Sequence, residues 1–134
     1  MAEKIKIEIV TPEAMVVSEE VDEITVTGTE GEFGVLPGHC HMLSALKVGG
    51  VSYKSSGAVR YLALGGGYAE VGPDKVSILA ESAEYSDKID VERAKAAMGR
   101  AEEALKTLSP DDKAYQEAEM ARLKAEVRLE MANR

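Results

Sequence analysis

The sequence has little cysteine, phenylalanine or proline, and it has no tryptophan. Because Cys40 is the only cysteine, no disulfide can form within the chain, and a reducing compartment is compatible with this composition. No apolar run approaches the length that spans a bilayer, and the first residues alternate charge with isoleucine instead of forming the apolar block of a signal peptide. We therefore expect no internal disulfide, no direct membrane insertion and no signal peptide.

Basic residues are too few to offset the acidic ones, 16 against 24, which gives a net charge of −8. The excess lies in residues 1–88, where 14 acids meet 7 bases, whereas residues 89–134 carry 10 acids and 9 bases. A negative surface repels nucleic acid and anionic lipid at long range, so we expect neither as a partner. The length of 134 residues fits one domain with an appendage.

Alternation of apolar and polar residues predicts short strands over the first two thirds of the chain. Ile5, Ile7 and Ile9 share one face of the first strand, which is typical of a half-buried position. The same pattern predicts strands at 4–10, 14–17, 21–27, 42–48, 51–54, 59–64, 68–71 and 75–80. Many short strands with closely spaced turns indicate a β-sandwich or β-barrel over residues 1 to about 85.

Glycine clusters predict where these strands turn. Gly49-Gly50 matches a two-residue hairpin turn that needs positive φ, and the segment 72–74 (GPD) gives a second hairpin signal. The triplet at 65–67 predicts a bulge or a sharp turn between strands, because no Gly-Lys-Ser/Thr sequence of a phosphate loop follows it.

The longest glycine-rich segment is 28–39, which contains four glycines and Pro37. Such a composition predicts a shaped loop instead of a helix or a regular strand. Phe33, Val35 and Leu36 are placed to pin this loop onto a core. An ordinary tight connection at the edge of a sandwich is the alternative interpretation.

The period of the apolar residues changes from two to between three and four at Asp90, which predicts a helix with Asp90 as its N-cap. Ser109 as N-cap and Pro110 at the first helical position predict a second helix that runs to about Met131. Each helix carries a stripe of alanines, Ala94, Ala97, Ala101 and Ala104 on the first and Ala114, Ala118, Ala121 and Ala125 on the second.

The two alanine stripes predict an antiparallel helical hairpin with closely spaced axes. Burying a CH₂ group stabilises by only ~0.8 kcal/mol, so alanine faces hold their neighbours weakly compared with leucine seams. We therefore expect a hairpin that forms from local propensity and is able to move, with a static helical appendage as the alternative.

The cluster His39-Cys40-His41 carries metal-ligating and nucleophilic side chains. In a strand the two histidines would point away from Cys40, and no other residue completes a known ligand spacing, so we expect neither a metal site nor cysteine catalysis. Arg93 and Arg100 lie two turns apart on one helix face, which suits carboxylates or phosphates; solvated arginines paired with nearby glutamates are the alternative.

Three segments carry a resemblance to a known family: residues 31–39 (GEFGVLPGH), residues 64–71 (LGGGYAEV), and Ile89-Asp90 with Arg93-Ala94. In this order, and followed by a helical hairpin, they resemble the epsilon-subunit family of bacterial F-type ATP synthases over essentially the whole chain. The resemblance implies an antiparallel β-sandwich at 1–85 and an antiparallel two-helix hairpin at 86–134.

The resemblance further implies a non-catalytic rotor subunit of the central stalk in a proton-translocating enzyme. Its sandwich would dock on the gamma subunit and the membrane c-ring, at the cytoplasmic face of the inner (plasma) membrane, as a peripheral protein. Glu32 and His39 match the family positions that contact the c-ring. The family usually has Ala-Pro after this histidine, where this sequence has Cys40-His41.

In the family the hairpin either folds against the sandwich or extends along the gamma subunit into the alpha/beta catalytic head, where it blocks ATP hydrolysis. In the extended state Arg122, Lys124 and Arg128 would meet acidic segments of the head. No cofactor is required, but ATP is expected as a regulatory ligand of the folded form. The positions that match the family's ATP-binding pattern are Glu84, Ile89, Asp90, Arg93, Ala94 and Arg100.

Two other classes of function remain alternatives. One is a β-sandwich adaptor whose helices at 89–134 serve only as a dimerisation arm and which ignores the gamma subunit. The other is a small hydrolase that uses Cys40 and a histidine, which a thiol-blocking assay would test. Neither alternative accounts for the glycine-rich segment 31–39 as well as the family does.

Overall fold

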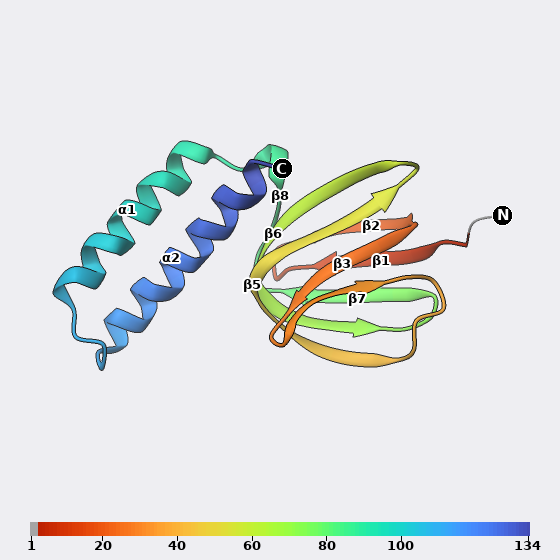
Figure 1. Cartoon of the computed structure of the whole chain (residues 1–134), viewed down its shortest axis with the longest axis horizontal. Helices are drawn as coiled ribbons and strands as arrows, with labels where there is room; N and C mark the ends of the chain where they lie inside the picture. The colour runs from red at the N-terminus through yellow and green to blue at the C-terminus, as the bar shows by residue number, and fades with distance from the viewer. Residues whose placement is uncertain (1–2) are drawn as a thin grey trace.

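The structure, a computed structural model, describes residues 3–134 and consists of a β-sandwich followed by two helices (Figure 1). The sandwich and the helical hairpin predicted from the sequence are thus confirmed. The strands are β1 (Ile5–Val10), β2 (Met15–Val21), β3 (Glu23–Gly28), β4 (Gly31–Val35), β5 (Met42–Ser55), β6 (Ala58–Val71), β7 (Lys75–Ala80) and β8 (Ala83–Tyr85). After them come the 3₁₀ turn η1 (Ser86–Lys88) and the helices α1 (Val91–Thr107) and α2 (Lys113–Ala132).

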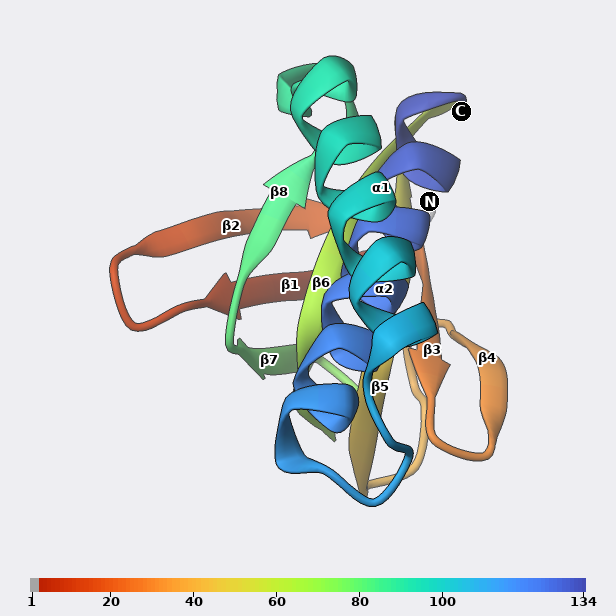
Figure 2. The same cartoon turned by 90° about the vertical axis from the view of Figure 1, so that its left-hand side faces the viewer.

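All eight strands belong to one sheet, in the order β2-β1-β7-β6-β5-β3-β4, with β8 paired to β6. The sheet folds over on itself, so that β2, β1 and β7 lie on one side and β3 and β4 on the other (Figure 2). The long strands β5 and β6 connect the two sides. All other neighbours pair antiparallel, but β1 and β7 are far apart in the sequence and run parallel, a pairing that the strand pattern did not predict.

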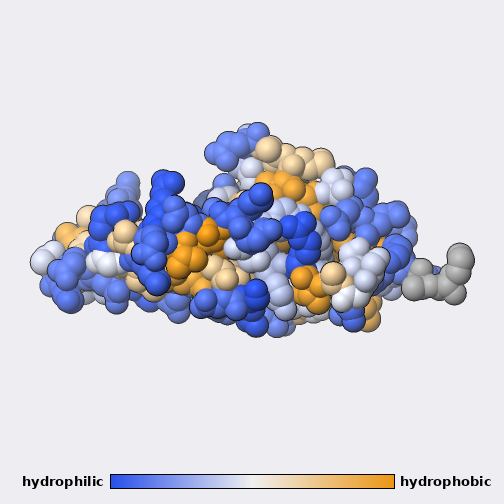
Figure 3. Space-filling model, turned by 90° about the horizontal axis from the view of Figure 1, so that it is seen from above, coloured by the Kyte–Doolittle hydropathy of each residue, from blue (hydrophilic) through white to orange (hydrophobic). Residues whose placement is uncertain are grey.

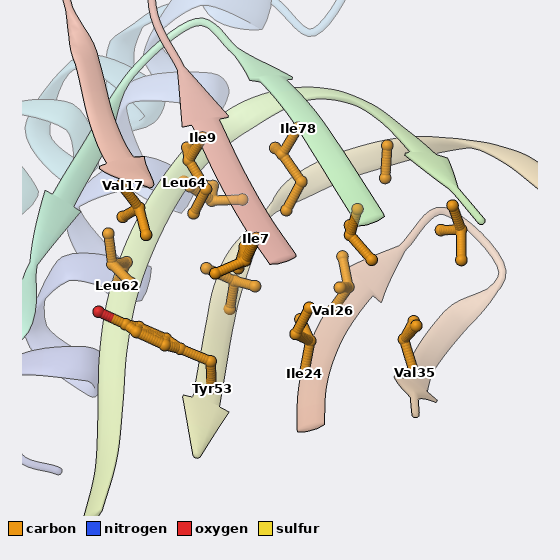
Figure 4. Packing of buried hydrophobic residues seen from close by; sticks show 14 of the residues in the cluster. Ile7, Ile9, Val17, Ile24, Val26, Val35, Tyr53, Leu62, Leu64 and Ile78 are labelled. Carbon is orange, nitrogen blue, oxygen red and sulfur yellow. The ribbon is translucent and has the colours of Figure 1, made fainter. Parts of the chain in front are cut away.

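The core is aliphatic and follows the period-two pattern. Ile5, Ile7 and Ile9 of β1 are 0% exposed and point between the two layers of the sandwich. Tyr53 of β5 extends across this space towards Leu62, and it is the one aromatic ring among the labelled core residues in Figure 4. Burial of this inward face therefore fixes the register of each strand, because a one-residue slip would turn every apolar side chain outward.

Two predictions made from glycines were wrong and one was confirmed. The segment 28–39 is not only a loop, because Gly31–Val35 forms β4, paired antiparallel with β3. Gly49-Gly50 is not a turn but lies inside β5, and the chain reverses instead at Ser56 and Gly57, which have φ of 51° and 85°. The hairpin signal at 72–74 is confirmed, since it joins β6 to β7 and the Gly72 N–H donates to the Lys75 carbonyl at 2.9 Å.

The triplet 65–67 likewise lies within one continuous strand, β6, and is not a turn between two strands. Gly66 and Gly67 have φ of 102° and 149°, in the region that favours glycine. A Cβ on Gly67 would lie 2.0 Å from the Leu79 carbonyl oxygen. On either side of these glycines, β6 pairs with β8 along Leu62–Leu64 and with β7 along Gly67–Val71.

The helices form the expected antiparallel hairpin, with α2 lying between α1 and the sandwich (Figures 1 and 2). The Asp90 carboxylate accepts a hydrogen bond from the Arg93 N–H at 3.1 Å, which confirms the predicted N-cap of α1. The predicted start of the second helix was wrong, because Ser109 lies in the connecting turn and α2 begins at Lys113 after Asp112.

The alanine stripes are confirmed on α1 but only in part on α2. Ala94 and Ala101 are buried, whereas Ala114 and Ala121 of α2 are exposed to solvent. The reason is that α2 faces α1 on one side and the sheet on the other, so its inner surfaces also need larger side chains. Of the helices in residues 3–134, neither is long and apolar enough to cross a membrane.

Candidate functional site

A row of apolar side chains crosses the outer surface of the sandwich over five neighbouring strands. Residues that are directly paired in a sheet share a face, and the pairing joins each member of this row to the next. We call it the outer apolar row; from β2 to β5 its members are Met15, Val10, Leu79, Tyr68 and Ala45.

The outer apolar row is exposed to solvent although it is apolar. Met15 is 55% exposed, Tyr68 60% and Leu79 61%. A hollow of about 420 Å³ lies at its centre, lined by Val10, Tyr68, Leu79 and neighbours at the end of β1. On the face shown in Figure 3, hydrophilic residues cover most of the surface and apolar residues emerge in separate patches. Exposed apolar side chains gathered in one place are typical of an interaction surface.

A second site is the contact between α2 and the sandwich. Met131 lies against Gly50 of β5, where an added Cβ would be 2.6 Å from the Met131 Sδ. Met131, Ala63 and Ile89 form a small buried cluster that is separate from the main core. We call this contact the hairpin seat.

Ion pairs flank the hairpin seat and join α2 to β8 and to the residues just before β8. The Arg128 guanidinium donates to both carboxylate oxygens of Glu84, at 2.9 and 3.3 Å. Lys124 Nζ lies 4.0 Å from a carboxylate oxygen of Glu81. Both pairs are partly exposed to solvent, so each stabilises the docked hairpin by no more than about 1 kcal/mol.

The N-terminal half of α2 is less tightly packed against the sheet. Met120 and Leu123 line a hollow of about 620 Å³ together with residues of β5 and the glycine segment of β6. Apolar contact between the hairpin and the sandwich therefore concentrates at the C-terminal end of α2, near Val127, Met131 and Ala132.

Arg122 was predicted to act together with Lys124 and Arg128, but its partners differ. Its guanidinium donates to Glu119 at 2.6 Å and to Glu126 at 2.9 Å, both on α2 itself. The hydrogen bond from Arg122 lowers the pKa of the Glu119 carboxyl below its usual 4.5. Detachment of the hairpin would therefore separate Lys124 and Arg128 from their partners and leave Arg122 paired.

The residues expected to bind ATP extend from β8, where Glu84 lies, to Arg100 in the middle of α1. Ile89 and Ala94 are buried, and the Asp90 carboxylate is engaged as the helix cap. Arg93 and Arg100 are exposed and take part in no ion pair within residues 3–134. The remaining member of the set, Glu84, is occupied by the ion pair described above.

The two residues expected to contact the c-ring have different surroundings in the structure. Glu32 is exposed on β4 and lines a hollow together with Tyr61 and the C-terminal end of α2. His39 lies beyond β4, where the Gly38 N–H donates to the Pro73 carbonyl at 2.8 Å and ties the connection to the β6–β7 turn. Cys40 is exposed, and its carbonyl oxygen lies 2.7 Å from His39 Nδ1.

Sequence reasoning missed both the outer apolar row and the hairpin seat. The row could have been found in β7, where Leu79 breaks the alternation by placing a large apolar side chain at an outward position. The sequence gave no comparable signal for the hairpin seat. Gly50, which accommodates Met131, was interpreted as part of a turn. Within residues 3–134, no group of three or more metal-ligating side chains is found.

Both parts of the chain match models of one protein family. Residues 4–86 match the beta-sandwich domain of the ATP synthase Delta/Epsilon chain, and residues 87–133 match its long alpha-helix domain. The two matches cover nearly the whole chain, in the order of the two structural units. The fold thus defines the class as a Delta/Epsilon chain of ATP synthase.

Individual relatives narrow this class. The chain is 58% identical to the ATP synthase epsilon chain of Geotalea uraniireducens over 98% of its own length and 96% of the relative's. It is 56% identical to that of Geobacter sulfurreducens, over 100% of the chain and 97% of the relative. The chain belongs to the ATP synthase epsilon-chain family, whose members are stalk subunits and not themselves catalytic.

Solved structures agree with this assignment. A chain in the mitochondrial ATP synthase of Euglena gracilis, from an OSCP/F1/c-ring assembly, superimposes with a TM-score of 0.84 at 27% identity. That match covers 98% of this chain and 82% of the other. A chain from the central stalk/c-ring of Tetrahymena thermophila gives a TM-score of 0.68 at 12% identity, over 97% of each chain, and shows the shared fold.

Proposed function

We propose that this chain is a rotor subunit of the central stalk in a proton-translocating F-type ATP synthase, docked on the gamma subunit and adjoining the c-ring. The observation that carries the proposal is the outer apolar row. Neighbouring strands are about 4.8 Å apart, so five strands present an apolar surface roughly 19 Å wide. Such a surface supports docking on a partner protein and explains why these side chains are left outside the core.

Docking through the row is also consistent with its surroundings. The neighbouring outward row contains the polar residues Glu8, Ser77 and Glu70, and it ends on β5 at the exposed Leu43. An apolar centre bordered by polar residues is the usual arrangement of a protein interface. The acidic surplus of the first 88 residues favours a partner surface with basic residues at its border.

The test is assembly with the gamma subunit. Replacing Tyr68 and Leu79 together by Glu places two charges in the row, and we expect at least a hundredfold loss of affinity for gamma in a pull-down titration. Val59→Glu is the matched control, since Val59 is also an exposed apolar residue on β6 but lies outside the row. Unchanged binding by the double variant would reject the row as the docking surface.

We further propose that the hairpin inhibits ATP hydrolysis by leaving the sandwich and entering the alpha/beta catalytic head. The hairpin seat is small and separate from the main core, so its release leaves the sandwich intact. Release also frees Lys124 and Arg128 to meet acidic segments of the head, whereas Arg122 keeps its partners on α2. The inhibited state is therefore expected to weaken as salt concentration rises.

The c-ring is proposed to meet the side of the sandwich that carries β4 and the connection after it, through Glu32 and His39. The Gly38–Pro73 hydrogen bond holds the connection, which supports a fixed position of His39 despite Cys40-His41 in place of Ala-Pro. We propose the cytoplasmic face of the inner (plasma) membrane as the location of the chain, as a peripheral member of the complex.

ATP is proposed as a regulatory ligand of the folded hairpin and not as a required cofactor. The exposed guanidinium groups of Arg93 and Arg100 are available for phosphate oxygens. ATP would favour the folded state only to the extent that it binds that state more tightly than the extended one.

A further inference from the structure

The outer apolar row reaches the helical hairpin at its β5 end. Its last two members, Tyr68 of β6 and Ala45 of β5, also line the hollow of about 620 Å³ beside the N-terminal half of α2. We call this space the α2 hollow. Figure 2 shows this half of α2 in front of β5 and β6. The row and the helix therefore border the same depression in the surface.

The α2 hollow shares a wall with the hollow at the centre of the row. Gly67, Tyr68 and Glu81 line both spaces. The Tyr68 side chain is largely exposed to solvent, so neither hollow is closed by it. A partner that covers Tyr68 from the side of the row therefore also lies at the mouth of the α2 hollow.

The hairpin contributes apolar side chains to the α2 hollow. Met120 and Leu123 of α2 line it, and Met120 is 44% exposed although its side chain is large and apolar. A methionine side chain is flexible and adapts to the shape of an apolar partner, and methionine is enriched at protein interfaces. An exposed methionine beside an apolar hollow is thus typical of an interaction surface.

Charged residues connect the shared wall to hairpin docking. The Glu81 carboxylate lies 4.0 Å from Lys124 Nζ, so the same residue borders the row and helps to hold α2. Lys47 of β5 also lines the α2 hollow. Two cations and one carboxylate thus surround this space, which favours an acidic residue at the border of the partner segment.

We propose that gamma contacts the docked hairpin as well as the sandwich, by placing an apolar side chain in the α2 hollow between Tyr68 and Met120. The inference rests on the proposed docking of gamma through the outer apolar row, and it adds α2 to that surface. Met120 and Leu123 leave with the hairpin, so gamma loses this contact when the hairpin extends. The contact therefore favours the docked hairpin, and by linkage the docked hairpin strengthens gamma binding by the same factor.

Gamma binding by the full-length chain tests the extended surface. Met120→Glu places a charge in the α2 hollow, and we expect the affinity for gamma in a pull-down titration to fall about tenfold. Ala121→Glu is the matched control, because it adds the same charge at the next residue, which is exposed and is not part of the lining of the hollow. Met120→Leu keeps an apolar side chain and should bind gamma like the unmodified chain.

Amide hydrogen exchange tests the coupling to the hairpin. Saturating gamma should slow the exchange of the α1 and α2 amides several-fold in the unmodified chain, because opening of the hairpin then also breaks the contact with gamma. Met120→Glu should remove this effect, whereas Ala121→Glu should keep it. Exchange in α1 and α2 that does not respond to gamma would overturn the inference.

The binding results separate this inference from the docking surface on which it rests. If Tyr68 and Leu79 are both replaced by Glu and gamma binding is unchanged, the row itself is wrong and the inference fails with it. If that double variant loses binding but Met120→Glu binds as tightly as Ala121→Glu, gamma occupies the row without reaching α2. In that case the inference alone is wrong.

Discussion

At the scale of single residues, Gly50 shows how a position in a strand is decided by an element far away in the sequence. It lies within β5, where glycine is unfavourable, and its φ is not in the region that requires glycine. What excludes a larger residue is Met131, whose thioether occupies the space of a side chain. The glycine is therefore explained by the docked hairpin and not by a turn.

We expect Gly50→Val to push Met131 out of the hairpin seat while leaving the sandwich folded. Overpacking of this kind costs about 1–3 kcal/mol, and most of it should fall on hairpin docking because Met131 is the side chain that can yield. Limited proteolysis should then cut the α1–α2 connection faster. Gly34→Val on β4 is the control, since a Cβ there meets nothing closer than the Ile24 carbonyl oxygen at 3.9 Å. Equal cutting of both variants would contradict the seat.

The misinterpretation of Gly50 marks the limit of prediction from sequence at this scale. The alternation of apolar and polar residues along a strand predicts its inward residues, such as Ile5, Ile7 and Ile9. This prediction depends only on residues that are near in the sequence. It does not give the position at which Met131 of the last helix meets the sheet. A pair of glycines is equally consistent with a turn and with a close approach of this kind.

At the scale of elements, α2 has two different surfaces with charged residues. Lys124 and Arg128 are one turn apart and both reach the sandwich, whereas Arg122 pairs with glutamates of its own helix. The helices, the Asp90 cap and most strands were predicted in type, whereas β4 and β8 were not predicted and β5 and β6 were each predicted as two strands. The start of α2 was not, because Ser109, Pro110, Asp111 and Asp112 all favour a helix N-terminus and only the packed turn decides among them.

The candidate ATP site belongs to α1 and can be tested on that helix. Replacing Arg93 and Arg100 together by Ala removes two exposed guanidinium groups, and we expect ATP binding by the full-length chain to weaken by at least tenfold in calorimetry. The sandwich should keep its melting temperature. Lys95→Ala with Lys106→Ala removes two other exposed cations of α1 as the control. The same ATP affinity in the arginine double variant would reject the site.

At the scale of the whole molecule, the chain has one large core and one small one. The sandwich core is continuous from β1 to β7, whereas the helices share with it only the cluster around Met131. The resemblance and the alanine stripes predicted this division in outline. Tyr85 packs against the main core, whereas Ile89 belongs to the cluster around Met131. This difference required the tertiary structure, because both side chains are large and hydrophobic and only their packing partners differ.

Deleting residues 89–134 should leave the sandwich folded and still bound to the gamma subunit. ATP hydrolysis by the assembled enzyme should rise several-fold, because the element proposed to enter the catalytic head is missing. Hydrolysis is measured in complexes reconstituted with full-length or truncated chain, and gamma binding is checked in the same preparations. An unchanged hydrolysis rate with intact assembly would contradict the inhibitory hairpin while leaving the docking surface supported.

The long β5–β6 ribbon also has a mechanical consequence. The two strands are paired from Met42 with Val71 to Ser55 with Ala58, and together they run through both layers of the sheet. The interstrand hydrogen bonds are perpendicular to the strands, so a force along the ribbon that stretches both strands together does not pull directly on these bonds. A sandwich built around this ribbon would deform little under torque. Detachment of the helices would not make the sandwich more deformable.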